Sequence, residues 1–358
     1  MKKIPVGILG ATGMVGQQYL QLLENHPWFE VCFLASSELS AGKTYTEAVS
    51  GRWHMDRPIP ERFMDFPVHR IDEIALAKQS CRFVFSAVGN DTAKIYEEKY
   101  VENGIAVISN AAYHRRSEDV PVLIPEVNPD HAQIIPIQQK NRNWKGGFIA
   151  AKPNCSLQSY MIPLSPLHRQ FKVQRLMLTT LQAVSGAGYP GISSLDILDN
   201  VIPYIANEEE KSELEPLKMW GHIEDNKIHP AGSIAISAQC NRVPVLDGHL
   251  ACVSVQFEKK PSKEEILDLW KNFTALPQTL QLPSAPERSI IYLDAADRPQ
   301  PRLDRNAGKG MSVTVGRLRD CPLFDYRFVA LSHNTIRGAA GGGILNAEFL
   351  MQQGYFEV

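Results

Sequence analysis

The sequence predicts an α/β protein with two domains: an N-terminal doubly wound domain built on a parallel sheet, and a following α+β domain. Three observations support this architecture. The chain has 358 residues, more than one hydrophobic core usually organises. Short apolar runs alternate with helical stretches in the first part of the chain. From Cys155 onward, strand-like runs instead alternate with helical segments and long polar connections.

The first strand, turn and helix follow one another directly. Residues 3–9 form a short apolar run that leads into a glycine-rich turn, and residues 15–23 place apolar side chains on one helical face. This pattern ends at His26-Pro27, and residues 31–35 form a second apolar run. Strand, helix and strand in this order predict a βαβ unit.

The same alternation returns further along the chain. Apolar runs at residues 83–87 and 105–109 enclose a helical stretch at residues 92–103, which predicts further parallel strands of a Rossmann-type sheet. Between the two parts of this pattern, residues 50–70 carry three prolines and mixed charges. This composition predicts an irregular insertion, to which the sequence assigns no role.

The second domain begins with strand-like runs, the clearest at residues 174–184, 251–257 and 326–332. A glycine-rich turn at residues 334–343 is expected to lead into a terminal helix that packs on the first domain. The expected domains are residues 1–154, completed by residues 334–358, and residues 155–333.

The composition argues against several classes of protein. With 44% hydrophobic residues, 21% charged residues and a formal net charge of -2, the chain is typical of an ordinary globular protein. Nothing in this balance indicates nucleic acid or a membrane as a partner. Pro5 and Gly7 interrupt the N-terminus before an apolar segment of signal-peptide length develops, so the expected location is the cytoplasm.

The cysteines show no CxxC pair and no compact framework. In a long chain this pattern predicts free thiols rather than disulfides or a metal site, so no metal is expected and one thiol is a candidate nucleophile. The six are Cys32, Cys81, Cys155, Cys240, Cys252 and Cys321.

The turn after the first strand is a candidate dinucleotide site. Gly7, Gly10, Gly13 and Gly16 recur every third residue where the strand turns into the helix. Small residues let the backbone approach a diphosphate, and the free N–H groups at the helix start favour its negative charge. Close packing of strand on helix also selects glycine, but the position directly after the first strand favours the dinucleotide.

The end of the second strand favours NADP(H) over NAD(H). NAD-binding domains usually carry Asp or Glu there, whereas this chain has Ala35-Ser36-Ser37, which does not repel a 2′-phosphate. Glu38 follows at once, and we expect no arginine nearby to bind the phosphate, with Lys43 as the only close cation. We therefore expect a moderate preference; a polar loop without a cofactor role is the alternative.

The segment Pro153-Asn154-Cys155-Ser156 precedes an apolar helical pattern. A cysteine at a helix N-terminus gains thiolate character from the dipole, and its backbone N–H is placed to bind an oxyanion. A buried structural cysteine is the alternative. Pro163 and Pro166 interrupt the pattern and predict a kinked or short helix.

Arg242 and His249 stand seven residues apart on a segment with the pattern of an extended chain ending in a turn. Thioester chemistry uses an acid or base near neutral pH and a cation that holds an anionic substrate. A structural histidine and a surface arginine are the alternatives.

Taken together, these motifs resemble aspartate-semialdehyde dehydrogenases, especially the branch shared by archaea and fungi. The motifs occur in family order over nearly the full chain, which is more specific than any one of them. They are residues 7–16, 109–111, 120–121 with 125–128, 153–156, 182–188, 208–211, 242–245 with 248–249, and 334–341.

The resemblance implies a role for each catalytic residue. Cys155 would be the nucleophile and His249 the acid/base. Gln182 would orient a thioester intermediate, and Asn154 completes the catalytic set.

The resemblance also implies the ligands. Arg242 and Glu208 would bind the carboxylate and amino group of the substrate, while Arg115 and Lys211 would hold the phosphate. The implied NADP contacts are Gly10, Thr12, Gly13, Met14, Val15, Gly16, Ser36, Ser37, Ser86, Ser185, Gly186 and Asn334. Two positions depart from the family: relatives often carry Arg where this chain has Glu38-Leu39, and Asn where it has Lys152.

The implied reaction is the NADPH-dependent reduction of aspartyl phosphate to aspartate semialdehyde with release of inorganic phosphate, in the biosynthesis of lysine, threonine and methionine. The implied assembly is a homodimer or homotetramer. A malonyl-CoA reductase is the nearest alternative, and Glu208 argues against it because malonyl-CoA has no ammonium group. N-acetyl-γ-glutamyl-phosphate reductase ranks third, since its cysteine motif differs. A non-catalytic dinucleotide-binding sensor is the alternative from another class.

Overall fold

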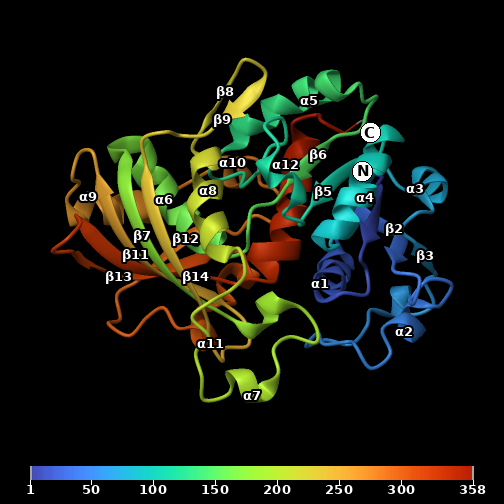
Figure 1. The fold of residues 1–358 in the computed structure, drawn as a ribbon, viewed down its shortest axis with the longest axis horizontal. Coiled ribbons are helices and arrows are strands. Elements are labelled where there is room, and N and C mark those ends of the chain that lie inside the picture. Colours follow the sequence, from blue (N-terminus) through green and yellow to red (C-terminus); the bar gives the residue numbers. More distant parts are fainter. Residues whose placement is uncertain (1, 357–358) are drawn as a thin grey trace.

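The computed structural model describes residues 2–356 and contains two six-stranded sheets. Figure 1 shows the first sheet on the right and the second on the left, with the red C-terminal helix α12 between them. The sequence expectation of a parallel α/β domain followed by an α+β domain is confirmed. Within the described residues, no helix has the length and apolar character needed to cross a membrane.

The first sheet is parallel, with strand order β3-β2-β1-β4-β5-β6. Its central strands β4 and β5 are buried along their length because helices cover both faces. The strands are β1 Ile4–Leu9, β2 Phe29–Ser36, β3 Val68–Arg70, β4 Phe83–Ser86, β5 Ala106–Ser109 and β6 Ile149–Ala151. The helices are α1 Met14–Leu23, α2 Tyr45–Ala48, η1 Glu61–Phe63, α3 Ile74–Ser80, α4 Asn90–Glu102, η2 Tyr113–Arg116, η3 Pro129–Gln133 and α5 Ile134–Arg142.

The sequence predicted an irregular insertion at residues 50–70. The structure shows that this segment is not wholly irregular. It ends in β3, which pairs in parallel with β2 and forms the edge of the sheet. Three residues are too few to show the alternation or apolar run by which a strand is recognised, and Pro67 directly before them obscured it further.

The second sheet is mixed, with strand order β10-β7-β11-β14-β13-β12. Its strands are β7 Val173–Gln182, β10 Ala235–Arg242, β11 His249–Phe257, β12 Ile290–Leu293, β13 Val313–Asp320 and β14 Tyr326–Ser332. A separate hairpin joins β8 His222–Glu224 and β9 Lys227–His229. The helices are α6 Leu157–Phe171, η4 Val184–Ala187, α7 Ser194–Ile197, α8 Glu208–Met219, α9 Lys263–Lys271, α10 Leu276–Thr279, α11 Pro301–Asp304 and η5 Ala307–Gly310.

The two faces of the second sheet differ. Helix α6 packs on one face against β11, β13 and β14, and alternate side chains of β7 such as Leu176 and Leu178 are buried beneath it. The other face carries exposed apolar side chains, among them Met177 of β7 and Cys252 of β11. One face of this sheet therefore lacks cover within the described chain.

The C-terminal segment is helical where the sequence predicted a glycine-rich turn. One π-helical turn, η6 Ile336–Ala340, continues directly into α12 Gly341–Gln352. The glycines serve close packing: a Cβ at Gly343 would lie 2.0 Å from the Tyr19 hydroxyl of α1. The expectation that this helix packs on the first domain is confirmed, because α12 contacts α1 and β5.

Candidate active site

Cys155 stands directly before α6, one residue ahead of the helix N-cap Ser156. Its side chain is partly exposed. The C-terminal segment lies against it, because a Cβ at Gly338 would come within 2.9 Å of the Cys155 Cβ. Of the two expectations, a kinked or a short helix, the second is wrong, because α6 runs for 15 residues with both Pro163 and Pro166 inside it.

The pKa of the Cys155 thiol is shifted in the direction opposite to that expected from its helix position. Burial raises the pKa of the Cys155 thiol, and the Glu208 carboxylate raises it further, whereas Lys152, Arg115 and Arg242 lower it. Burial and the Glu208 carboxylate thus oppose the effect expected from the helix N-terminus. The neighbouring cations act in the opposite direction.

Lys152 is one of these cations and lies deep in the protein. It follows β6, is 2% exposed, and its Nζ donates to the carbonyl of Pro153 at 2.5 Å. Burial lowers the pKa of Lys152 to about 7. In the sequence, Lys152 was noted only as a departure from relatives. In the structure, its side chain contacts the segment that leads to Cys155.

A hydrogen-bonded network converges on Glu208, the first residue of α8. Asn154 Nδ2 donates to both carboxylate oxygens at 2.9 and 3.0 Å, and Gln182 Nε2 donates at 3.1 Å. Lys211 Nζ pairs with the same carboxylate at 2.8 Å. Asn154, Gln182 and Lys211 thus meet at the buried carboxylate of Glu208. The sequence had assigned these four residues separately to catalysis, substrate binding and phosphate binding.

Glu215 belongs to the same network but was missed by sequence reasoning. It accepts hydrogen bonds from Arg115 Nη1 at 2.9 Å and from the backbone N–H of Asn154 at 2.7 Å. Glu208, Lys211 and Glu215 follow an i, i+3, i+7 spacing, which puts all three on one face of α8. That spacing is the signal that indicates Glu215 from the sequence.

Arg242 and His249 lie on different strands rather than on one extended segment. Arg242 ends β10 and His249 begins β11, and β7 lies between these strands with Gln182 as the partner of Arg242. Both side chains touch Gly186: a Cβ there would lie 2.8 Å from Arg242 Nη1 and 3.1 Å from His249 Nε2. Any side chain at position 186 would therefore collide with both polar groups, so glycine is required there.

His249 is fully buried and held in one orientation. Its Nδ1 accepts a hydrogen bond from the backbone N–H of Ala183 at 3.1 Å, while its Nε2 has no partner among the described residues. Since Nδ1 accepts, the neutral ring carries its hydrogen on Nε2. Burial, followed by the charge of Arg242, lowers the pKa of His249 to about 3.

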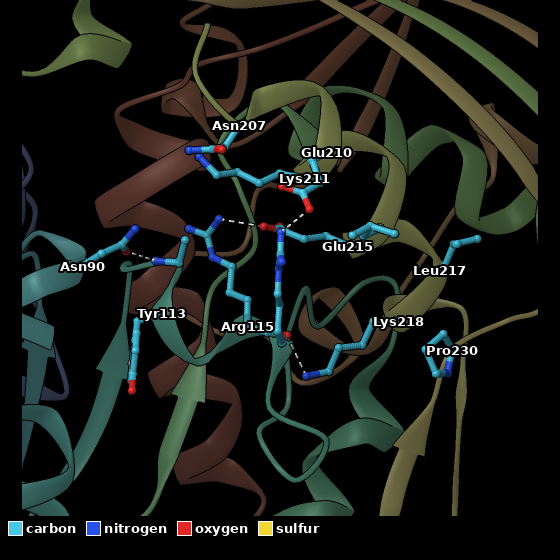
Figure 2. A pocket seen from close by; sticks show the side chains of 13 residues that line it. Asn90, Tyr113, Arg115, Asn207, Glu210, Lys211, Glu215, Leu217, Lys218 and Pro230 are labelled. Carbon is cyan, nitrogen blue, oxygen red and sulfur yellow. Dashed lines mark hydrogen bonds and ion pairs between the residues drawn. The ribbon is translucent and has the colours of Figure 1, made fainter. Parts of the chain in front are cut away.

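A cavity of about 540 Å³ opens beside this network and is lined by residues of η2 and α8. Figure 2 shows Arg115, Lys211 and Glu215 close to one another in its wall, with Lys218 nearby. Both residues expected to hold phosphate therefore face one cavity. Cys155 is not part of its lining.

Most of the expected cofactor residues lie at the C-terminal edge of the first sheet, whereas Ser185, Gly186 and Asn334 follow strands of the second sheet. Gly10 has a φ of +78° and a Cβ there would strike the Ala87 carbonyl at 2.7 Å, so only glycine fits the turn. Gly13 caps α1 without any side-chain hydrogen bond, which leaves the N–H groups of the first turn, Met14 to Gly16, for a ligand. This cradle fits a diphosphate.

Three hydrogen bonds hold Ser36, Ser185 and Asn334 in place. Thr12 Oγ1 and Ser36 Oγ are 2.6 Å apart, which joins the glycine turn to the end of β2. Asn334 Nδ2 donates to Ser185 Oγ at 2.8 Å, and its Oδ1 accepts the Gly248 N–H. Ser37 is exposed. By contrast, Ser86 is fully buried at the end of β4 and its hydroxyl has no partner among residues 2–356.

A second cavity, of about 820 Å³, connects the two halves of the molecule. Its wall includes Met14 of α1, Ser185 of η4 and His54 of the 50–70 segment. The His54 ring stacks on Tyr189 with centroids 4.4 Å apart. The 50–70 segment, to which the sequence assigned no role, thus covers part of the cleft between glycine turn and η4.

The six cysteines are all free thiols, as the sequence predicted. In the part of the chain that the structure describes, no three His, Cys, Asp or Glu side chains gather to hold a metal ion.

Two family models match the chain. The semialdehyde dehydrogenase NAD binding domain matches residues 5–135, and the semialdehyde dehydrogenase dimerisation domain matches residues 164–337. The aspartate-semialdehyde dehydrogenase of Archaeoglobus fulgidus is 46% identical over 348 residues, which cover 97% of this chain and 98% of that protein.

Solved structures agree with these matches. A crystal structure of aspartate semialdehyde dehydrogenase with NADP from Candida albicans superimposes with a TM-score of 0.90 at 40% identity, and the match covers 99% of this chain and 100% of that one. Aspartate semialdehyde dehydrogenase II of Vibrio cholerae, complexed with ASA, gives a TM-score of 0.76 at 26% identity over 99% of this chain and 100% of that one.

Proposed function

The chain belongs to the aspartate-semialdehyde dehydrogenase family, as its motifs predicted, and we propose that it catalyses the NADPH-dependent reductive dephosphorylation of L-4-aspartyl phosphate to L-aspartate 4-semialdehyde. One observation carries this proposal most directly: the Glu208 carboxylate is bonded to Asn154, next to Cys155, and to Gln182. A buried carboxylate beside the nucleophile matches a substrate that carries an ammonium group.

Cys155 is the proposed nucleophile. Its sulfur attacks the acyl carbon of aspartyl phosphate, a C–S bond forms, and the C–O bond to phosphate breaks with the electron pair leaving on phosphate. When bound at the glycine turn, NADPH would supply a hydride for reduction of the resulting thioester. Cleavage of the C–S bond then releases the aldehyde and returns the electron pair to the Cys155 sulfur.

His249 is the proposed acid/base. Each tetrahedral species in this sequence carries an oxyanion, and the neutral His249 ring donates a hydrogen bond to it from Nε2–H, which stabilises the negative charge until the species collapses. This role is supported by the partnerless, buried Nε2 and by the fixed tautomer. Gln182 holds the thioester carbonyl in position, from the end of β7.

The substrate and phosphate sites follow from the cations around the network. Arg242 is proposed to bind the substrate α-carboxylate and Glu208 its ammonium group. Arg115 and Lys211 are proposed to bind phosphate, which is supported by their shared cavity. Both cations are paired with carboxylates, Arg115 with Glu215 and Lys211 with Glu208. Phosphate binding therefore competes with these existing ion pairs for the two cations.

The cofactor is proposed to lie along the C-terminal edge of the first sheet. The glycine turn and the first turn of α1 hold the diphosphate, Ser36 and Ser37 the ribose end, and Ser185, Gly186 and Asn334 the nicotinamide end. Residues 1–154, completed by residues 334–358, form the proposed cofactor domain, and residues 155–333 the proposed catalytic and dimerisation domain.

The proposed assembly is a homodimer in the cytoplasm. It is supported by the match to a dimerisation domain over residues 164–337 and by the uncovered face of the second sheet, where Met177 and Cys252 are exposed. Burial of such a face removes apolar area from water.

The decisive experiment compares substrates. We expect the purified chain to reduce NADP in the presence of aspartate semialdehyde only when phosphate is added, and to turn over malonyl-CoA with NADPH at least about 100-fold more slowly. If malonyl-CoA is turned over faster than aspartate semialdehyde, the proposed substrate is wrong and the chain is a malonyl-CoA reductase. Nucleotide binding without turnover of either compound would favour the non-catalytic sensor.

A further inference from the structure

The loop after β2 contains an ion pair that the sequence did not predict. Arg70 Nη2 lies 3.1 Å from Glu38 Oε1. Glu38 follows the end of β2 by two residues, whereas Arg70 is the last residue of β3. The expectation that no arginine lies near this loop, with Lys43 as its only cation, is therefore wrong.

The register of the two strands fixes where Arg70 lies. In the parallel ladder of β2 and β3, Arg70 is the partner of Ser36. Ser36 in turn is bonded to Thr12 of the glycine turn at 2.6 Å. In doubly wound domains the ribose next to the adenine binds at the end of the second strand, so a guanidinium beside Ser36 stands at the level of the ribose 2′ position.

The guanidinium is oriented and accessible. Asp72 accepts from Nε at 2.9 Å and from Nη2 at 2.8 Å, and Glu73 accepts the Arg70 backbone N–H at 2.9 Å. The side chain is 49% exposed. Since its contacts with described residues use Nε and Nη2, the Nη1 hydrogens remain for another acceptor. Such a planar fork suits a phosphate group.

Glu38 is a weak competitor for this fork. Its side chain is 79% exposed, and exposed ion pairs contribute little to stability, about 0 to 1 kcal/mol. A 2′-phosphate carries about two negative charges and three acceptor oxygens, so it displaces a single exposed carboxylate readily.

We propose that Arg70 selects NADP(H) over NAD(H) by binding the 2′-phosphate, and that Glu38 moderates this preference by competing for the same guanidinium. The inference rests on the proposed cofactor site and deepens it. Recognition thus comes from β3, the neighbouring strand, instead of from the loop that follows β2.

The test measures nucleotide binding directly, without substrate. Isothermal titration calorimetry of the full chain with 2′,5′-ADP and with ADP isolates the 2′-phosphate. We expect Arg70→Ala to weaken 2′,5′-ADP binding about 10- to 100-fold and to change ADP binding less than about twofold. Arg70→Lys keeps the charge without the fork and should give an intermediate loss.

Two further variants separate the roles of the neighbouring charges. Glu38→Gln removes the competitor and should tighten 2′,5′-ADP binding about two- to fivefold. Lys43→Ala is the matched control: this exposed loop cation donates to the Leu39 carbonyl at 2.7 Å, and its loss should leave the ratio between the two nucleotides unchanged.

Kinetics supply the second arm. Wild-type kcat/KM should favour NADP over NAD by about one to two orders of magnitude, and Arg70→Ala should bring this ratio near one. The role of Arg70 would be overturned if Arg70→Ala weakened binding of 2′,5′-ADP and ADP equally, or weakened neither. It would also be overturned if Lys43→Ala changed the ratio of the two affinities. A wrong substrate assignment shows only in the turnover arm, because the binding arm contains no aldehyde.

Discussion

The backbone N–H of Ala183 donates to Nδ1 of His249 at 3.1 Å, and this contact decides what the imidazole can do. Protonation to the imidazolium would place a hydrogen on Nδ1, facing the Ala183 N–H. Burial, followed by the charge of Arg242, lowers the pKa of His249 to about 3, and the position of the Ala183 N–H opposes protonation as well. His249 is therefore a neutral donor through Nε2 near pH 7.

We predict that the ring signals of His249 do not titrate between about pH 5 and pH 8, where an ordinary imidazole changes charge. NMR of histidine-labelled protein, with His249→Gln to assign the signal, makes the measurement. The sign for stability follows: between about pH 6.5 and pH 3 the unfolded chain binds a proton here that the folded chain does not, so stability decreases as pH falls. Titration of His249 near pH 6.5 would contradict the assigned tautomer.

The Lys152 ammonium is predicted to favour the Cys155 thiolate. Replacement by Met removes a nearby positive charge, so the pH dependence of Cys155 alkylation by iodoacetamide should move to higher pH, with a rate about 3- to 10-fold lower near pH 7. Lys218→Met is the control, since this second buried lysine bonds the carbonyls of Arg115 and Ser117 instead. If the pH dependence of Cys155 alkylation is unchanged in Lys152→Met, Lys152 does not stabilise the Cys155 thiolate.

The same lysine predicts a pH dependence of stability. Burial lowers the pKa of Lys152 to about 7, whereas the ordinary value is near 10.4. Stability therefore decreases as pH falls from about 10.4 to about 7, and it changes no further below pH 7, where the amine is charged in both the folded and the unfolded state. Lys152→Met should therefore raise the free energy of unfolding by about 1–3 kcal/mol at pH 6 and by less at pH 9. Urea unfolding at the two pH values measures this difference.

Cys155→Ser is predicted to lower kcat by at least about 1,000-fold while fold and nucleotide binding stay intact, because a hydroxyl is a far poorer nucleophile than a thiol. Cys252→Ser, on the exposed side of β11, serves as control and should keep full activity. Mass spectrometry with an alkylating substrate analogue should label Cys155. Labelling of Cys240 or Cys252, with turnover retained in Cys155→Ser, would refute the mechanism.

Arg115→Ala and Lys211→Ala are predicted to raise the KM for phosphate about 10- to 100-fold and the KM for aldehyde much less. Arg116→Ala is the control: it lines the same cavity but is exposed and paired with Glu210. Equal changes for both substrates would indicate general damage to the cavity and would refute the phosphate assignment.

Local sequence determined much of the first domain and the positions of the candidate nucleophile and glycine turn. Periodicity identified β1, α1 and β2, because each spans enough residues to show an apolar pattern. The glycine turn and Cys155 could be assigned from their neighbours in sequence, since a strand–turn–helix junction and a helix start are local features. The three residues of β3 are too few to show such a pattern, so this strand could not be predicted.

Tertiary structure alone decided which side chains meet and how they are charged. Glu208 joins Asn154 and Gln182 across separate elements, and Arg70 reaches Glu38 only because β3 pairs with β2. Burial raised the pKa of Cys155 against the helix dipole, and one backbone N–H fixed the tautomer of His249. Hydrogen bonds and desolvation depend on distances between residues far apart in the chain, and a pattern of residue types along the sequence does not contain those distances.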